Sequence, residues 1–157
     1  MSVVVLRQVE INDLDAIFEH MRDQESVRMA AFTPEDPSDR NRFDAHMEMV
    51  MSNPEGTLRA VTSDDLLVGT IASFVSDGAT EVTYWIDRAY WGQGVASRAL
   101  AIFLDEVRVR PLLARAASDN VGSLRVLHKA GFQLLRTEVA FARGRGTEIE
   151  ETILQLP

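Results

Sequence analysis

The sequence contains no cysteine, and this absence excludes several kinds of chemistry. Disulfide bridges, thiolate nucleophiles and cysteine-based zinc sites all need a residue that the chain of 157 amino acids does not have. A chain without cysteine suits a reducing compartment, and we expect a cytoplasmic location. The apolar run at the N-terminus ends at Arg7 and has no basic flank, so it is not typical of a signal peptide. No apolar stretch approaches the length that a membrane span requires.

Motifs for metals, nucleotides and hydrolysis are also missing. The histidines His20, His46 and His128 share no metal-ligand spacing, and no HExxH motif or EF-hand loop occurs, so we expect no metal. There is no Gly-Lys pair for a P-loop and no G-x-S-x-G elbow for a serine hydrolase. The net charge of −8 argues against nucleic acid as a partner. Residues 1–60 alone hold 12 acids and 6 arginines, which could attract a cationic substrate or simply form a solvated surface.

The length and ordinary composition indicate one domain over residues 1–157. Apolar periodicity and turn residues predict, in order, a strand, two helices, three strands, a helix, a strand, a helix and two strands. A loop about 25–39 is predicted between the first two helices. Ser118 or Asp119 is predicted to cap the last helix. This order indicates an α/β domain.

The most informative segment is Tyr84–Ser97, where a β-favouring run leads through two glycines into a helix-forming run. Gly92 and Gly94 tolerate positive φ and let a ligand approach the main chain. The unpaired N–H groups and the dipole of a helix N-terminus favour an anion there, most naturally a phosphate. A plain strand-to-helix turn is the alternative. A dinucleotide fingerprint is excluded, because Ser97 replaces its third glycine and no acid follows at the expected distance.

The order of elements and two motifs resemble the GNAT acetyltransferase superfamily. Trp91–Ala96 (WGQGVA) is similar to its pyrophosphate loop, in the form common among the Rim-type ribosomal-protein N-terminal acetyltransferases. Asn120–Phe132 resembles the N-x-x-S-x-x-V-L-x-K-x-G-F signature of the same branch. The resemblance covers essentially the whole chain. It implies a single GNAT-like α/β (α+β) domain with four helices and a mixed, mostly antiparallel sheet of about seven strands, splayed between the fourth and fifth strands.

The resemblance also implies acetyl-CoA as co-substrate, with its pantetheine arm between the splayed strands. Main-chain groups of the fourth strand would bond the pantetheine amides, amides of the glycine turn would hold the pyrophosphate, and Asn120 would bond the arm near the thioester. The residues that the resemblance assigns to the cofactor are Trp85, Ile86, Gly92, Gln93, Gly94, Val95, Ala96, Ser97, Asn120 and Ser123.

The implied reaction is transfer of the acetyl group to a primary amine by direct attack. A protonated amine must first lose a proton. Glu81 on the fourth strand is the first candidate base, followed by Asp87 and Tyr84; an exposed acid at a strand end is the alternative reading of Glu81. Many superfamily members protonate the leaving thiolate with a tyrosine, but Leu127 occupies that position. In the Rim branch Ser123 is the implied replacement, and it could equally be a helix-start residue that bonds the backbone.

The sequence leaves four kinds of acceptor open: a protein N-terminus, a small amine, an amino acid or an antibiotic amine. The acidic first half of the chain favours a cationic acceptor. The rival interpretation is a non-catalytic acyl-CoA-binding or sensor module. Leu127 favours that module, whereas the presence of Asn120 and Ser123 favours the enzyme. Neither nucleic acid nor a membrane is expected as a partner, and a homodimer is left open.

Overall fold

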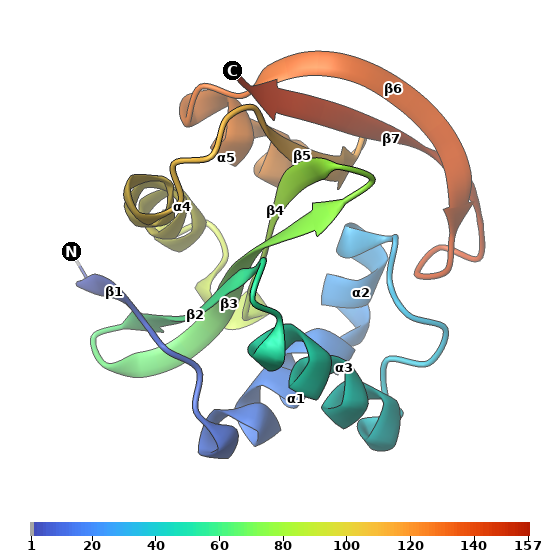
Figure 1. The fold of residues 1–157 in the computed structure, drawn as a ribbon. Coiled ribbons are helices and arrows are strands. Elements are labelled where there is room, and N and C mark those ends of the chain that lie inside the picture. The colour runs from blue at the N-terminus through green and yellow to red at the C-terminus, as the bar shows by residue number, and fades with distance from the viewer. Residues whose placement is uncertain (1) are drawn as a thin grey trace.

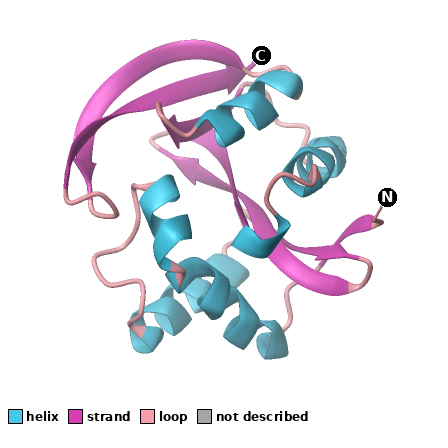
Figure 2. Cartoon of the chain, turned by 180° about the vertical axis from the view of Figure 1, so that it is seen from behind, coloured by secondary structure: helices cyan, strands magenta, loops and turns pink. Residues whose placement is uncertain are grey.

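The computed structural model describes residues 2–157. Its seven strands form one sheet in the order β1-β2-β3-β4-β5-β7-β6, with helices on both faces (Figures 1 and 2). The strands are β1 (Val4–Arg7), β2 (Thr57–Ser63), β3 (Leu66–Ser76), β4 (Ala79–Ile86), β5 (Leu112–Ala117), β6 (Gln133–Ala142) and β7 (Thr147–Leu156). The helices are α1 (Leu14–Arg22), α2 (Gln24–Ala30), α3 (Arg40–Ser52), α4 (Val95–Glu106) and α5 (Val121–Lys129), with 3-10 turns η1 (Ile11–Asp13) and η2 (Arg88–Tyr90).

The predicted mixed sheet is confirmed, but the predicted number of four helices is wrong. The additional helix is α2, which begins where the sequence indicated a loop. It has only seven residues, Gln24–Ala30, too few to show a helical apolar stripe against the background of a loop. The side chain of Asp23 caps it by accepting from the Ser26 N–H at 3.1 Å. The helix is therefore specified by its cap and by its neighbours in space.

The sheet opens between its two parallel strands, β4 and β5. These strands pair only at Thr80 with Leu112 and at Glu81 with Leu113. On its other side β4 stays paired with β3 from Ala79 to Ile86. The free edge of β4 beyond Glu81 therefore faces a gap in the sheet, as the resemblance implied.

The main-chain groups that face this gap follow from strand geometry. In an antiparallel pair, successive residues direct their N–H and C=O groups to opposite sides. The N–H of Asp87 donates to the Val68 carbonyl at 2.7 Å, on the side of β3. Trp85 has the same parity and also faces β3, so Tyr84 and Ile86 are the residues that direct main-chain groups into the gap. Of the two predicted residues, Ile86 directs its main-chain groups into the gap, and Trp85 directs them toward β3.

The main core fixes the two helices that border the gap. Phe103 and Leu100 of α4, Leu127 of α5 and Leu154 of β7 are each at most 1% exposed and belong to one apolar cluster. Burial of each such side chain contributes about 1.5–3 kcal/mol. This packing holds the N-termini of α4 and α5 rigidly beside the free edge of β4.

The β6–β7 hairpin curves around one side of the domain, and its tip lies beside the end of α2 (Figure 1). The Gly144 N–H donates to the Ala31 carbonyl at 2.8 Å, directly after α2. Arg145 donates to both carboxylate oxygens of Asp119 at 2.7 and 2.8 Å, just ahead of α5. The tip thus ties α2 to the start of α5.

Asp13 joins β1 to the first helical turn and provides a stability test. Its carboxylate accepts from Arg7 at 2.8 and 2.9 Å and from the Glu10 N–H at 2.7 Å. The Arg7 hydrogen bonds lower the pKa of Asp13 from 3.8, although burial opposes them. Asp13→Asn should reduce the free energy of unfolding by about 1–3 kcal/mol at neutral pH. Because the folded pKa is the lower one, this difference should shrink as the pH falls below 3.8. Urea unfolding of both proteins at pH 7 and pH 3 measures it; an equal difference at both would contradict the assignment.

Candidate active site

A cavity of about 450 Å³ lies beside the free edge of β4, where the sheet has opened. Its walls come from β4, from the turn and first residues of α4, from α5 and from α2. Of the residues that the sequence assigned to the cofactor, those that line it are Trp85, Ile86, Gly92, Gly94, Val95, Ala96, Ser97, Asn120 and Ser123. Gln93 does not line it; its side chain donates to the Ala89 carbonyl at 3.3 Å.

The glycine turn presents an uncapped helix N-terminus to this cavity. Gly92 and Gly94 have φ values of +77° and +76°. Helix α4 starts at the next residue, Val95, with no side-chain cap and no acid in its first turn. The first N–H groups of α4 are therefore available to an anion, which the helix dipole also favours.

The side chains of Arg98, which the sequence did not single out, and of Trp91, the first residue of the motif, hold this turn in place. Arg98 donates to the carbonyls of Gln93 at 3.1 Å and Gly94 at 3.2 Å. The indole N–H of Trp91 donates to the Ile86 carbonyl at 2.9 Å. The turn is fixed by contacts within the protein, so a ligand would find its amides already oriented.

Asn120 begins α5 and is its N-cap, so the predicted caps Ser118 and Asp119 are wrong. Its Oδ1 accepts from the Ser123 N–H at 3.2 Å, and its Nδ2 donates to the Met29 carbonyl of α2 at 3.4 Å. A side-chain amide carries two N–H donors. One of them therefore stays available at the wall of the cavity.

Helix α5 also contributes two basic residues that sequence reasoning missed. Arg125 and Lys129 both line the cavity. They are four residues apart and so lie on one helix face. This spacing was the available signal, and it gives the cavity a positive wall that suits phosphate groups.

A pair of hydroxyl groups bridges the cavity between β4 and α5. The Tyr84 hydroxyl lies 2.8 Å from Ser123 Oγ, and both residues line the cavity. Burial raises the pKa of Tyr84 to about 12, although the Ser123 hydrogen bond acts in the opposite direction. Ser123 takes part in the start of the helix with its N–H, which donates to Asn120 Oδ1. Its hydroxyl faces Tyr84 in the cavity.

Glu81 lies outside the lining of this cavity, on the part of β4 that pairs with β5. It is 8% exposed, so the reading as an exposed acid at a strand end is wrong. Its Oε1 accepts from Arg115 Nε at 2.6 Å, and Arg115 also contacts Glu151 and Glu138, each at 3.3 Å. Burial raises the pKa of Glu151, while Arg115 opposes that shift. With Arg136, which bonds Glu138 at 2.8 Å, this cluster has three carboxylates and two guanidinium groups.

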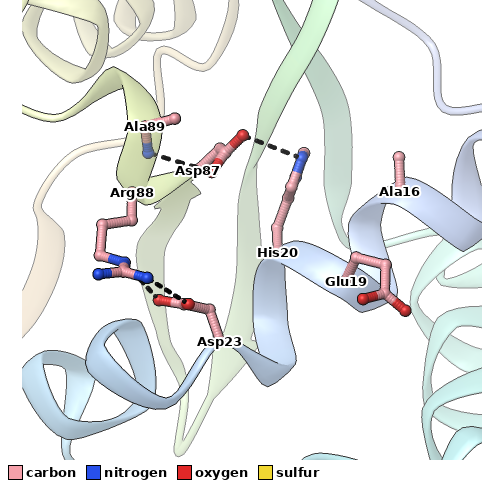
Figure 3. Close-up of a pocket in the computed structure, with 7 residues that line it drawn as sticks. All are labelled: Ala16, Glu19, His20, Asp23, Asp87, Arg88 and Ala89. Atoms are coloured by element: carbon pink, nitrogen blue, oxygen red, sulfur yellow. Dashed lines mark hydrogen bonds and ion pairs between the residues drawn. The ribbon is translucent and has the colours of Figure 1, made fainter.

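A second cavity of about 770 Å³ lies between α1 and η2 (Figure 3). It contains Asp87, the second candidate base, whose Oδ2 is 3.7 Å from His20 Nε2. Asp87 also accepts from the Ala89 N–H, and Arg88 pairs with Asp23 (Figure 3). Burial lowers the pKa of His20 more than Asp87 raises it, so the imidazole is neutral at physiological pH. Hydrogen bonds join the walls of the two cavities: the Trp85 indole donates to the His20 carbonyl at 2.9 Å, and Ser26 donates to Asp23.

Among residues 2–157, no group of three or more His, Asp or Glu side chains is arranged to hold a metal ion. None of the helices in the same range combines the length and the apolar character needed to cross a membrane.

The sheet that opens between β4 and β5 and the cavity beside the glycine turn indicate a domain of the GNAT fold. The family model described as "Acetyltransferase (GNAT) domain" matches residues 4–133, and the chain belongs to this family.

Named relatives agree with the family. The chain is 32% identical over 102 residues to the probable N-acetyltransferase YjcK of Bacillus subtilis, a match that spans 59% of this chain and 56% of YjcK, little more than half its length. The fold is similar to that of yncA from Salmonella typhimurium, solved with its cofactor acetyl-CoA, with a TM-score of 0.78, 21% identity and 98% and 92% of the two chains covered. It is also similar to that of RimJ from Mycobacterium smegmatis in complex with CoA-disulfide, with a TM-score of 0.78, 19% identity and 98% and 81% covered.

Proposed function

We propose that this protein is an acetyl-CoA-dependent N-acetyltransferase of the Rim-type branch that acetylates a primary amine by direct attack. The observation that carries the proposal is the cavity between β4 and α5, in which the uncapped N-terminus of α4 meets the free strand edge of β4. The two motifs in Trp91–Ala96 and Asn120–Phe132 support the branch. The acceptor class comprises protein N-termini, amino acids, small amines and antibiotic amines.

The residues of the cavity fit the chemical parts of coenzyme A. Amides from Gly92 to Ser97 would hold the diphosphate, with Arg125 and Lys129 adding positive charge. The pantetheine arm resembles an extended peptide, and the main-chain groups on the free edge of β4 would bond its amides as a neighbouring strand would. The remaining N–H of Asn120 would hold the arm near the thioester. When bound, acetyl-CoA supplies an acetyl group activated by a thiolate leaving group.

Glu81 is our proposed base for the acceptor amine. Arg115 binds Oε1 and fixes the side chain, and Oε2 lies outside that bond and can take the proton directly or through a water. The five-residue cluster around Arg115 carries one more negative than positive group, which together with the acidic first sixty residues favours a cationic acceptor.

The proposal is tested with the full chain. Calorimetry with coenzyme A should show binding, and mass spectrometry should detect acetylated products when acetyl-CoA is incubated with a panel of amines and peptides. Binding without any product would favour the non-catalytic acyl-CoA module, the reading that Leu127 supports. No heat with coenzyme A would reject both.

The glycine turn gives a matched test of the cofactor assignment. Gly92→Ala places an alanine at a φ of +77°, a conformation that costs a residue with a side chain about 1–2 kcal/mol. If the free turn relaxes to avoid this cost, the same energy must be supplied when coenzyme A binds to the original conformation. The Kd for coenzyme A should therefore rise about 5- to 30-fold. Gly78→Ala is the control, since Gly78 has the same φ of +77° and the same open surroundings but lies in the β3–β4 turn. Equal effects of both variants on Kd would contradict the assignment.

A homodimer would use the exposed edge strand β6. Leu134, Val139 and Phe141 on this strand are 63%, 68% and 56% exposed. An uncovered apolar edge strand is a template for pairing with a second chain. Light scattering of the protein and of a Val139→Lys variant would test this: a dimer that the variant separates supports it, and a monomeric wild type rejects it.

A further inference from the structure

The hydroxyl pair of Tyr84 and Ser123 lies at the point where the leaving sulfur would emerge. Tyr84 comes three residues after Glu81, which is the last β4 residue that pairs with β5, so Tyr84 stands where the gap opens. Ser123 comes from the first turn of α5, directly across the cavity. The 2.8 Å contact between their oxygens makes them one hydrogen-bonded unit.

Few other groups in this cavity could give a proton to sulfur. Leu127, at the position of the tyrosine acid of many GNAT enzymes, is 1% exposed and packs in the core. The other hydroxyl-bearing residues of the described lining are Ser26, Tyr90 and Ser97. Ser26 donates to Asp23 at 2.9 Å, while Tyr90 and Ser97 flank the glycine turn, at the diphosphate end of the proposed site. The region near the thioester therefore has Tyr84 and Ser123 as its hydroxyl groups.

The resemblance to the Rim branch implies that Ser123 protonates the leaving sulfur; we propose that Tyr84 acts through Ser123 as its positioning and proton-supplying partner. This inference rests on the proposed function. Ser123 Oγ–H breaks as S–H forms, and Ser123 takes the proton of the Tyr84 hydroxyl. Tyr84 regains a proton, through water, from the amine nitrogen that has become bonded to the acetyl carbon. In sum one N–H bond breaks and one S–H bond forms, and both hydroxyl groups end unchanged.

The 2.8 Å contact fits donation in either direction, and the relay uses the one in which the Tyr84 hydroxyl donates. When Tyr84 donates to Ser123 Oγ, the hydrogen of Ser123 is free to point into the cavity. Burial keeps the pKa of Tyr84 at about 12, so the phenol stays protonated, and remains a donor, throughout the physiological range. The group that protonates sulfur thus stays on α5, four positions before Leu127, and Tyr84 of the facing strand β4 stands behind it.

The test uses Tyr84→Phe, Ser123→Ala and the double variant. Each single change should lower kcat about 10- to 100-fold. The Kd for coenzyme A should stay within about twofold, because the proposed role of the hydroxyl pair is confined to the chemical step. The double variant should be no slower than the slower single one, because the two hydroxyls act as a unit. The solvent deuterium isotope effect on kcat should fall in all three variants, which a merely structural hydroxyl bond would not produce.

Thr62→Val is the matched control, since Thr62 on β2 also has a buried hydroxyl, bonded to the Val5 carbonyl at 3.2 Å, but lies far from the cavity. Its kcat and isotope effect should equal those of the wild type. An unchanged kcat in Tyr84→Phe, multiplicative losses in the double variant, or an unchanged isotope effect would each overturn the relay. A wild type that neither binds coenzyme A nor transfers acetyl would instead reject the proposed function itself.

Discussion

Glu81→Gln should lower kcat for acetyl transfer about 100- to 10,000-fold, the usual contribution of a general base. The glutamine keeps the size of the side chain and can still accept a hydrogen bond from Arg115, but it cannot take a proton from the amine. Because Glu81 does not line the cofactor cavity, the Kd for coenzyme A should not change. Steady-state kinetics with the best amine from the panel, and calorimetry with coenzyme A, measure both quantities.

Glu138→Gln is the control for this experiment. Glu138 contacts the same guanidinium group, at 3.3 Å, but it comes from the edge strand β6. Its loss also removes one negative charge next to Arg115, so it reports any effect of that charge alone. Equal losses of kcat in the two variants would show that the cluster acts through its field and that Glu81 is not the base.

The sequence predicted the parts of the site that depend on local chemistry. The strand, glycine turn and helix around Gly92 and Gly94 were predicted because positive φ and a helix N-terminus leave a local pattern, and both glycines have that φ. The resemblance implied a seven-stranded sheet with a gap between β4 and β5, and the structure confirms both. Because the glycine turn and the gap lie next to each other, most of the predicted cofactor residues line the cavity.

The parts that the sequence did not predict depend on contacts between distant residues. Arg115 meets Glu81 across 34 positions, through a strand register that no local pattern reveals. Arg98 holds the glycine turn by bonding carbonyl groups, which any residue could provide. Helix α2 lacks a periodic apolar face and exists because Asp23 caps it and the hairpin tip holds its end. The alternative reading of Glu81 as an exposed acid was wrong because its burial also comes from residues distant in the sequence, on the neighbouring strands.

Gly69→Ala should be the most destabilising substitution among those considered. Gly69 on β3 pairs with Ile86, and a Cβ at this position would lie 2.2 Å from the Trp85 carbonyl oxygen and 2.9 Å from Ile86 Cδ1. Main-chain atoms cannot rotate away as a side chain can, so β3 and β4 would have to separate. Overpacking of a rigid core costs about 1–3 kcal/mol or more, and this contact should reach or exceed the upper value. Urea unfolding measures the loss.

The same substitution connects the stability of the sheet with the site. The strand that it displaces is β4 at Trp85 and Ile86, whose free edge forms a wall of the cavity, so a folded Gly69→Ala protein should also bind coenzyme A more weakly. Gly122→Ala is the contrasting variant for stability: its Cβ would meet nothing closer than Asn120 Oδ1 at 3.9 Å. Alanine in a helix is more stable than glycine by about 0.5–1 kcal/mol, so Gly122→Ala should be neutral or stabilising. If Gly69→Ala unfolds at the wild-type urea concentration, the close approach of β3 to β4 is incorrect, and so is the position of the strand edge on which the cofactor assignment depends.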